Sequence, residues 1–251
     1  MTTETIVIAA FLFLLIAIIY SSVGHAGSSG YLAIMALLSF APETIKPTSL
    51  ILNIVVATIA SYKFIKANYF DIRIFLILIA TSLPAAFIGG YLTISPKYFK
   101  LIAGLFLILA SGLLLFREYS KKQNSELVKM PVKWGLAIGS IIGLISGLIG
   151  VGGGIFLSPI IIMANWTSIK NASGIAALFI LVNSISGLAG HLTAINQVDS
   201  NIIYWIIAVI IGGLTGSYLG TAKLQNRIII TCLFLVLLTA GLKFVLIDFL
   251  K

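Results

Sequence analysis

Two glycine-rich segments are the places where this sequence has the means to bind a ligand. They read Gly24-His25-Ala26-Gly27-Ser28-Ser29-Gly30 and Gly150-Val151-Gly152-Gly153-Gly154, and we call them the first and the second elbow. A helix that starts within a membrane leaves its first backbone N–H groups unpaired, and these groups attract an anion together with the positive end of the helix dipole. Glycine allows a ligand to approach the backbone closely. The elbows therefore predict anion binding at two helix N-termini.

Polar side chains in or beside the apolar stretches supply a second group of candidates. A lysine there could hold an anion by its charge, or it could anchor a helix end at the lipid headgroups. Asparagine and serine could hydrogen-bond a ligand or join two helices. His25 could couple proton movement to transport, or it could be a satisfied hydrogen-bonding residue in a tight turn. The predicted substrate-binding residues are Gly24, His25, Gly27, Ser28, Ser29, Lys46, Asn53, Gly150, Gly152, Gly153, Gly154, Lys170, Ser173 and Asn183.

The distribution of charged residues limits which class of protein this chain can belong to and which substrates it can bind. Hydrophobic residues make up 60% of the 251 residues and charged residues 9%, against about 25% charged residues in a typical soluble domain. This composition excludes a cytosolic enzyme and a nucleic-acid-binding module. The net charge is +9, and the basic residues lie between the apolar stretches, where the cytoplasmic loops of membrane proteins collect Lys and Arg. No Asp or Glu lies in the middle of an apolar stretch, which favours an anion or a neutral substrate. The single cysteine, Cys232, excludes an internal disulfide, and we expect no cofactor, no metal and no nucleic-acid partner.

The elements that must position these residues are membrane-spanning helices. Six charge-free stretches have the length of one span, which is roughly 20 residues. Two further stretches, 5–42 and 134–169, are too long for one span and too short for two, and each contains an elbow. We expect an all-α polytopic membrane protein with eight solid transmembrane helices and two short glycine-broken helices. The six single-span stretches are 47–62, 74–96, 101–116, 171–198, 200–222 and 228–242.

The order of features indicates an internal repeat. Gly24 aligns with Gly150, Lys46 with Lys170, and similar pairs follow in the same order along both halves. The chain therefore looks like a duplicated unit of about 100 residues, with a first transmembrane repeat at 1–116, a polar linker at 117–133 and a second repeat at 134–251. If the short helices change the direction of the chain, the two copies are inverted. We favour this arrangement over parallel copies because it divides the basic loop residues more unequally between the two sides.

Several other residues are expected to have packing or anchoring roles. Gly143, Gly147, Gly187 and Gly190 form pairs of small residues four or three positions apart, which usually mean close helix packing. Trp134, Trp166 and Trp205 lie near predicted span ends, as tryptophans at a membrane interface do. His191 ends a predicted span beside a polar loop, and we expect it at the interface too.

Three segments of the second half resemble the TauE/SafE family of sulfite and organosulfonate exporters. They are Gly150–Pro159, Lys170–Gly174 and Asn183–Gly187, and Ser22–Leu32 with Lys46–Ser49 resemble the first half of that family. The resemblance implies movement of a small oxyanion or sulfur-containing anion across a prokaryotic plasma membrane. The first elbow departs from the family pattern, because His25 and Ser28 stand where the second elbow has Val151 and Gly154.

These observations predict a secondary transporter of a small anion, not an enzyme. The two halves would give alternating access to a central site, with a proton or a sodium ion as the coupling ion; the oligomeric state stays open. A passive anion channel is an alternative. An intramembrane serine protease is another, because Gly27-Ser28-Ser29-Gly30 fits the Gly-x-Ser-Gly pattern of rhomboids and His25 or His191 could act as the base.

Overall fold

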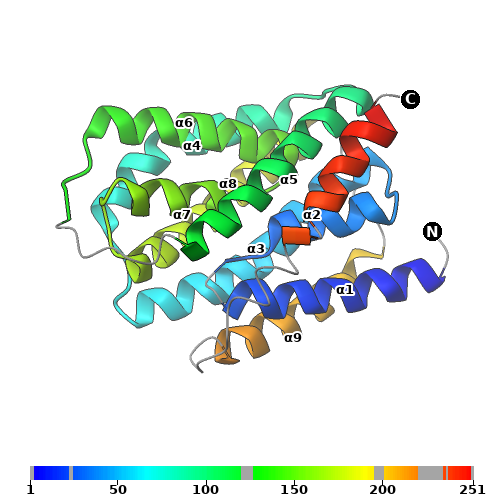
Figure 1. Cartoon of the computed structure of the whole chain (residues 1–251), viewed down its shortest axis with the longest axis horizontal. Coiled ribbons are helices and arrows are strands. Elements are labelled where there is room, and N and C mark those ends of the chain that lie inside the picture. The colour runs from blue at the N-terminus through cyan, green and yellow to red at the C-terminus, as the bar shows by residue number, and fades with distance from the viewer. Residues whose placement is uncertain are drawn as a thin grey trace.

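Every element of the structure, a computed structural model, is helical in the part of the chain that it describes (Figure 1). The described residues are 3–22, 25–119, 127–194, 201–219, 234–235 and 237–249. The helices are α1 (Thr3–Ser22), α2 (Ser28–Leu37), α3 (Pro42–Lys66), α4 (Ile72–Tyr91), α5 (Pro96–Tyr119), α6 (Val132–Ile149), α7 (Gly154–Met163), α8 (Ile169–Ala194), α9 (Ile202–Leu219) and the π-helix η1 (Lys243–Phe249), which continues a helical stretch from residue 237.

The helix lengths fit a protein that spans a membrane. A bilayer core offers no water to backbone polar groups, so a spanning segment must satisfy them within a helix. Six described helices, α1, α3, α4, α5, α6 and α8, are long and apolar enough to cross a membrane. Shorter apolar helices lie at 28–37, 154–163, 202–218 and 237–246. The all-α membrane fold is therefore confirmed, while the count of eight solid spans stays a prediction.

Both long apolar stretches are interrupted where the glycines predict it. The first stretch divides into α1 and α2, and the second into α6 and α7. Each of the short helices α2 and α7 has 10 residues, which is a length of about 15 Å. Because a bilayer core is about 30 Å thick, neither can cross it alone.

The short helices turn back along the helices that precede them. Ser29 of α2 lies beside Tyr20 of α1, with 2.8 Å between the two hydroxyl oxygens. Two residues further on, the ring of Tyr31 packs on that of Phe13 with 5.5 Å between centroids, so α2 runs antiparallel to α1. The α7 helix ends near the start of α6, since the turn after α7 accepts a hydrogen bond from Val128 N at 2.7 Å.

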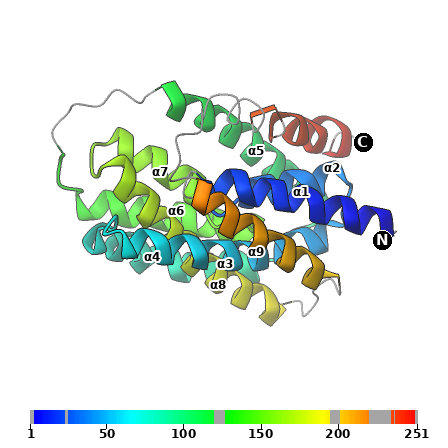
Figure 2. The ribbon, with the colours of Figure 1, turned by 90° about the horizontal axis from the view of Figure 1, so that it is seen from below.

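The helices that precede the two short helices, α1 and α6, run in opposite directions. In Figure 1, α1 runs leftward from the end marked N, whereas α6 starts at the left, after the linker, and runs rightward. Figure 2 shows the same relation after a quarter turn. Each of these helices packs on a helix of the other half, α1 on α9 and α6 on α4.

Glycines make these helix pairs close. A Cβ atom at Gly143 would lie 2.6 Å from Ser82 Cα, and one at Gly147 would lie 2.7 Å from Gly90 N. Gly187 meets Gly147, and Gly190 meets the backbone of α4, so the packing role predicted for these four glycines is confirmed. On the other side, Gly212 has the same role against α1.

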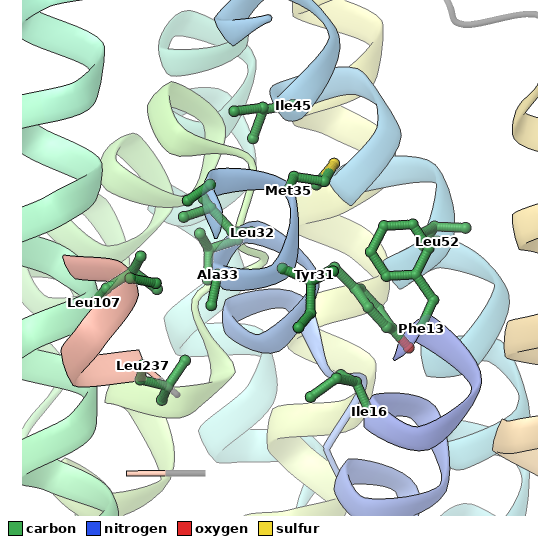
Figure 3. Close-up of a cluster of buried hydrophobic side chains, with 14 of the residues drawn as sticks. Phe13, Ile16, Tyr31, Leu32, Ala33, Met35, Ile45, Leu52, Leu107 and Leu237 are labelled. Carbon is green, nitrogen blue, oxygen red and sulfur yellow. The ribbon is translucent and has the colours of Figure 1, made fainter. Parts of the chain in front are cut away.

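Both short helices are enclosed by protein. Along α2, residues Ser28–Ala36 are all buried. Figure 3 shows its side chains between those of α1 and α3 on one side and Leu107 and Leu237 on the other. Most of α7 is also buried, against α4, α6 and α8. This enclosure is the condition under which a broken helix survives within a membrane.

The anchoring prediction for Trp205 is wrong. Trp205 is fully buried, with its ring 5.7 Å from that of Phe13 and its Nε1 3.3 Å from Ile6 O, because the packing of α9 on α1 turns this side chain inward. His191 is only 3% exposed and lines a pocket beside Lys46. Trp134 is 64% exposed at the start of α6, as an interface anchor would be.

Candidate functional site

The two short helices begin with the same backbone turn. Gly27 precedes α2 with φ 94° and ψ 8°, and Gly153 precedes α7 with φ 78° and ψ −8°. This left-handed conformation is the one that glycine adopts without steric cost. Neither glycine has a side chain to cap the helix, so no such group competes with a ligand for the first N–H groups of either helix.

The two short helices also end alike. Leu38 N donates to Ile34 O and Ala164 N donates to Ile160 O, at 2.9 and 3.0 Å. The residue after each of these caps again has a positive φ, 59° at Ser39 and 54° at Asn165. Elbow, short helix and closing turn thus have one backbone design in both halves.

The second elbow lies between α3 and α8 and faces polar side chains from both. A Cβ atom at Gly152 would lie 3.3 Å from Asn53 Nδ2, 3.0 Å from Ser184 Oγ and 2.7 Å from Ile180 Cγ2. Asn53 and Ser184 are fully buried. Among the described residues, neither Nδ2 nor Oδ1 of Asn53 has a hydrogen-bond partner. The hydroxyl of Ser184 has none among them either. Buried polar groups without a partner are costly, so this contact is where a polar ligand would be stabilising.

The first elbow contacts the short helix of the other half. His25 is 4% exposed, and its Nε2 lies 3.3 Å from the hydroxyl of Ser158 on α7. Ser29 pairs with the Tyr20 hydroxyl, whereas a serine nucleophile needs a base at this distance. Gly24 lies outside the described residues, and Ser28 is buried at the start of α2. The first elbow is therefore a polar contact between the halves.

Lys46 is brought to the second elbow, but through its main chain. A Cβ atom at Gly150 would lie 2.8 Å from Lys46 O. The ammonium group lies at the end of α4, where it donates to the carbonyls of Gly89, Gly90 and Leu92 at 3.1, 2.7 and 3.3 Å. A cation is favourable at a helix C-terminus, so Lys46 holds α4 in place.

The remaining candidates are not gathered at the elbows. Lys170 is exposed, with its Nζ 3.1 Å from Tyr69 Oη and 4.9 Å from the centre of that ring. Ser173 is buried one turn further along α8. Asn183 Nδ2 donates to Phe179 O in its own helix at 2.9 Å, while Asn183 Oδ1 has no partner among the described residues. The lysines that match in sequence thus have unlike environments.

Three residues near the site have roles that the sequence reasoning did not assign. Ser184 and Ser158 face the second and the first elbow, and His191 lines the pocket beside Lys46. Serines in small-residue stretches usually join helices, as Ser186 does by donating to Leu83 O at 2.7 Å. The available signal for Ser184 and Ser158 was their position next to Asn183 and Pro159, in the segments that resemble the TauE/SafE family.

Comparison with known proteins identifies the family. The family model described as Sulfite exporter TauE/SafE matches residues 9–244. The chain belongs to the TauE/SafE family. A relative of this TauE/SafE chain, a probable membrane transporter protein of Sinorhizobium fredii, is 33% identical over 246 residues, covering 97% of this chain and 99% of the relative.

More distant relatives of this TauE/SafE protein have similar names. A probable membrane transporter protein of Bacillus subtilis is 24% identical over 227 residues, covering 81% of each chain. One of Xylella fastidiosa is 31% identical over 144 residues, covering 54% of this chain and 52% of the relative. No solved structure matches the chain significantly. The protein is thus a membrane transporter of the TauE/SafE family.

Proposed function

We propose that this TauE/SafE protein is a secondary transporter of a small anion, either sulfite or another sulfur-containing oxyanion or organosulfonate. The name of the matching family supports the choice of sulfite as the first substrate to test. The bacterial relatives support a location in the plasma membrane of a prokaryote. The absence of carboxylates from the middle of the apolar stretches supports an anionic over a cationic substrate.

The observation that carries this proposal is the contact at Gly152. At this position the uncapped start of α7 faces the unpartnered side chains of Asn53 and Ser184. Backbone N–H groups, an amide and a hydroxyl are all able to donate hydrogen bonds to an anion. The positive end of the α7 dipole adds to that attraction.

Alternating access would come from two inverted halves that move relative to each other. The opposite directions of α1 and α6 and the exchange of partners between α1–α9 and α4–α6 support inverted copies. The described residues of both elbows are buried. Buried elbows fit a transporter that opens one side at a time better than a passive channel. The His25–Ser158 contact is a place where the halves would separate.

Uptake into proteoliposomes tests the proposal directly. The purified protein should take up labelled sulfite or a sulfonate, and an imposed proton or sodium gradient should change the rate. Gly152→Val should abolish uptake, because its side chain would overlap Ile180 and Ser184 and displace them from the elbow. Gly112→Ala is the matched control, since a Cβ atom there meets no other atom within 4 Å. Indifference to every anion under all gradients would refute the proposal.

A further inference from the structure

A pocket next to the second elbow contains two buried polar residues. It lies where α3 starts and α4 and α8 end, and its volume is about 60 Å³. This is several times the roughly 10–15 Å³ that one water molecule requires, so a small ion with part of its hydration shell fits. Among its lining residues are Lys46, His191, Glu43, Thr93 and Leu148.

The charge of Lys46 lacks a carboxylate partner among the described residues. Its side chain is 7% exposed, and its hydrogen-bond partners are the three carbonyls at the end of α4. Carbonyl dipoles satisfy the N–H groups but leave the unit charge in place. A buried charge without a counter-ion is costly, so an anion in this pocket would be stabilised. Glu43 lines the same pocket from an exposed position and weakens this attraction in part.

His191 adds a hydrogen-bonding group that has no partner. It is 3% exposed, and within the described chain its Nε2 has no hydrogen-bond partner. Imidazole Nε2 donates a hydrogen bond in one neutral tautomer and in the charged form. An oxyanion in the pocket would accept this bond and lie in the field of Lys46.

We propose that the pocket lined by Lys46 and His191 is a separate binding site for a small oxyanion, next to the second elbow. We call this site the station. The pocket and the elbow share a wall, because Leu148 lines the pocket two residues before Gly150, and the main chain of Lys46 touches Gly150. The station rests on the proposed anion substrate. It differs from the elbow site in its residues, and it binds by the lysine charge and the imidazole instead of backbone amides.

Equilibrium binding to the delipidated protein in detergent tests the station. Calorimetric titration with sulfite, sulfate and ethanesulfonate should show binding that His191→Leu weakens about tenfold or more, the usual effect of losing a hydrogen bond to a charged group. Glu43→Gln should strengthen binding by about two- to fivefold at low ionic strength, because it removes a like charge. Lys66→Met, at the exposed other end of α3, is the control and should bind as the wild type.

The two substitutions should change the binding affinity in opposite directions, which a general loss of structure would not do. If His191→Leu does not fold, His191→Gln and Glu43→Gln carry the comparison. Unchanged affinity in both the His191 variant and Glu43→Gln would overturn an anion-binding station. Weaker binding in Glu43→Gln would overturn it as well. A lipid headgroup carries the same oxyanion chemistry, so dihexanoyl phosphatidylglycerol is titrated in parallel. Binding of this lipid alone would overturn the assignment to a solute.

Failure of the station and failure of the transport proposal can be told apart. Asn53→Leu removes the amide that faces Gly152 and leaves the pocket residues intact. This variant should lose uptake while keeping the oxyanion binding that depends on His191. Uptake that depends on Asn53, together with binding that is indifferent to His191, would overturn the station alone.

Discussion

At the scale of single residues, environment separates side chains that look equivalent in the sequence. Lys46 and Lys170 occupy matching places in the two halves. Lys46 is buried and holds the end of α4, whereas Lys170 lies exposed on the ring of Tyr69. Their substitution should therefore have different consequences for stability.

We expect Lys46→Met to destabilise the protein by about 2–4 kcal/mol, because three carbonyls lose their charged donor. Lys170→Met should change stability by no more than about 0.5 kcal/mol, since exposed pairs contribute little. Thermal unfolding in detergent measures both. Equal losses would contradict the role of Lys46 as a helix cap.

The side-chain amide of Asn53 makes no hydrogen bond within the described part of the fold. We expect Asn53→Leu to raise the unfolding temperature, because replacing an unpartnered buried amide gains about 1 kcal/mol or more. The same variant should lose anion uptake. Asn183→Leu is the comparison, since its amide nitrogen already bonds Phe179 O, and it should gain less. Lower stability with normal uptake in Asn53→Leu would count against the site.

At the scale of elements, the position of each short helix depends on the glycine before its first residue and on the groups that contact its last turn. The left-handed glycine at each start reverses the chain, so that α2 and α7 return along α1 and α6. At the end of α2, Lys243 Nζ donates to Ala36 O and Leu37 O at 2.6 and 3.1 Å. Both ends of α2 are thereby held within the protein.

Gly153→Ala should destabilise the fold through both backbone and packing. An L-residue in the left-handed conformation costs roughly 1–2 kcal/mol, and the added Cβ would lie 2.5 Å from Ile142 Cγ2, which adds about 1–3 kcal/mol of overpacking. Gly112→Ala, in the open middle of α5, should instead stabilise by about 0.5–1 kcal/mol. Chemical unfolding curves of the two variants compare them, and similar curves would contradict this account of the elbow.

At the scale of the whole molecule, the basic residues gather at one end. The turns after α3 and α7 meet at this end, since Lys170 contacts Tyr69 and Val128 bonds Asn165. Because cytoplasmic loops collect Lys and Arg, this end should face the cytoplasm. The basic residues with described side chains at this end are Lys63, Lys66, Arg73, Lys129, Lys133 and Lys170, against Lys46, Lys97, Lys100 and Lys243 at the other end.

Cysteine labelling measures this orientation. In a Cys232→Ser background, Ser95→Cys should react with a membrane-impermeant maleimide in intact cells. Lys129→Cys and Ser168→Cys, both exposed, should react only after the cells are opened. If the two halves were parallel, Ser168→Cys would react together with Ser95→Cys, which would contradict inverted copies.

The sequence alone was sufficient for the properties that depend on local chemistry. Long apolar stretches require helices within a bilayer, and the glycine runs interrupt them between Ser22 and Ser28 and between Ile149 and Gly154. The close-packing glycines of α6 and α8 were predictable for the same reason, because a small side chain is a local property. The family followed from short motifs that contain these same residues.

Only the tertiary structure decided which side chains meet. His191 reaches the pocket of Lys46, Ser184 faces Gly152, Trp205 is buried and Lys170 is apart from the elbows. These outcomes depend on how each helix is rotated and shifted against its neighbours. In a bilayer those parameters come from van der Waals packing between small residues far apart in the chain, such as Gly90, Gly147 and Gly187, and apolar spans of similar composition do not encode them locally.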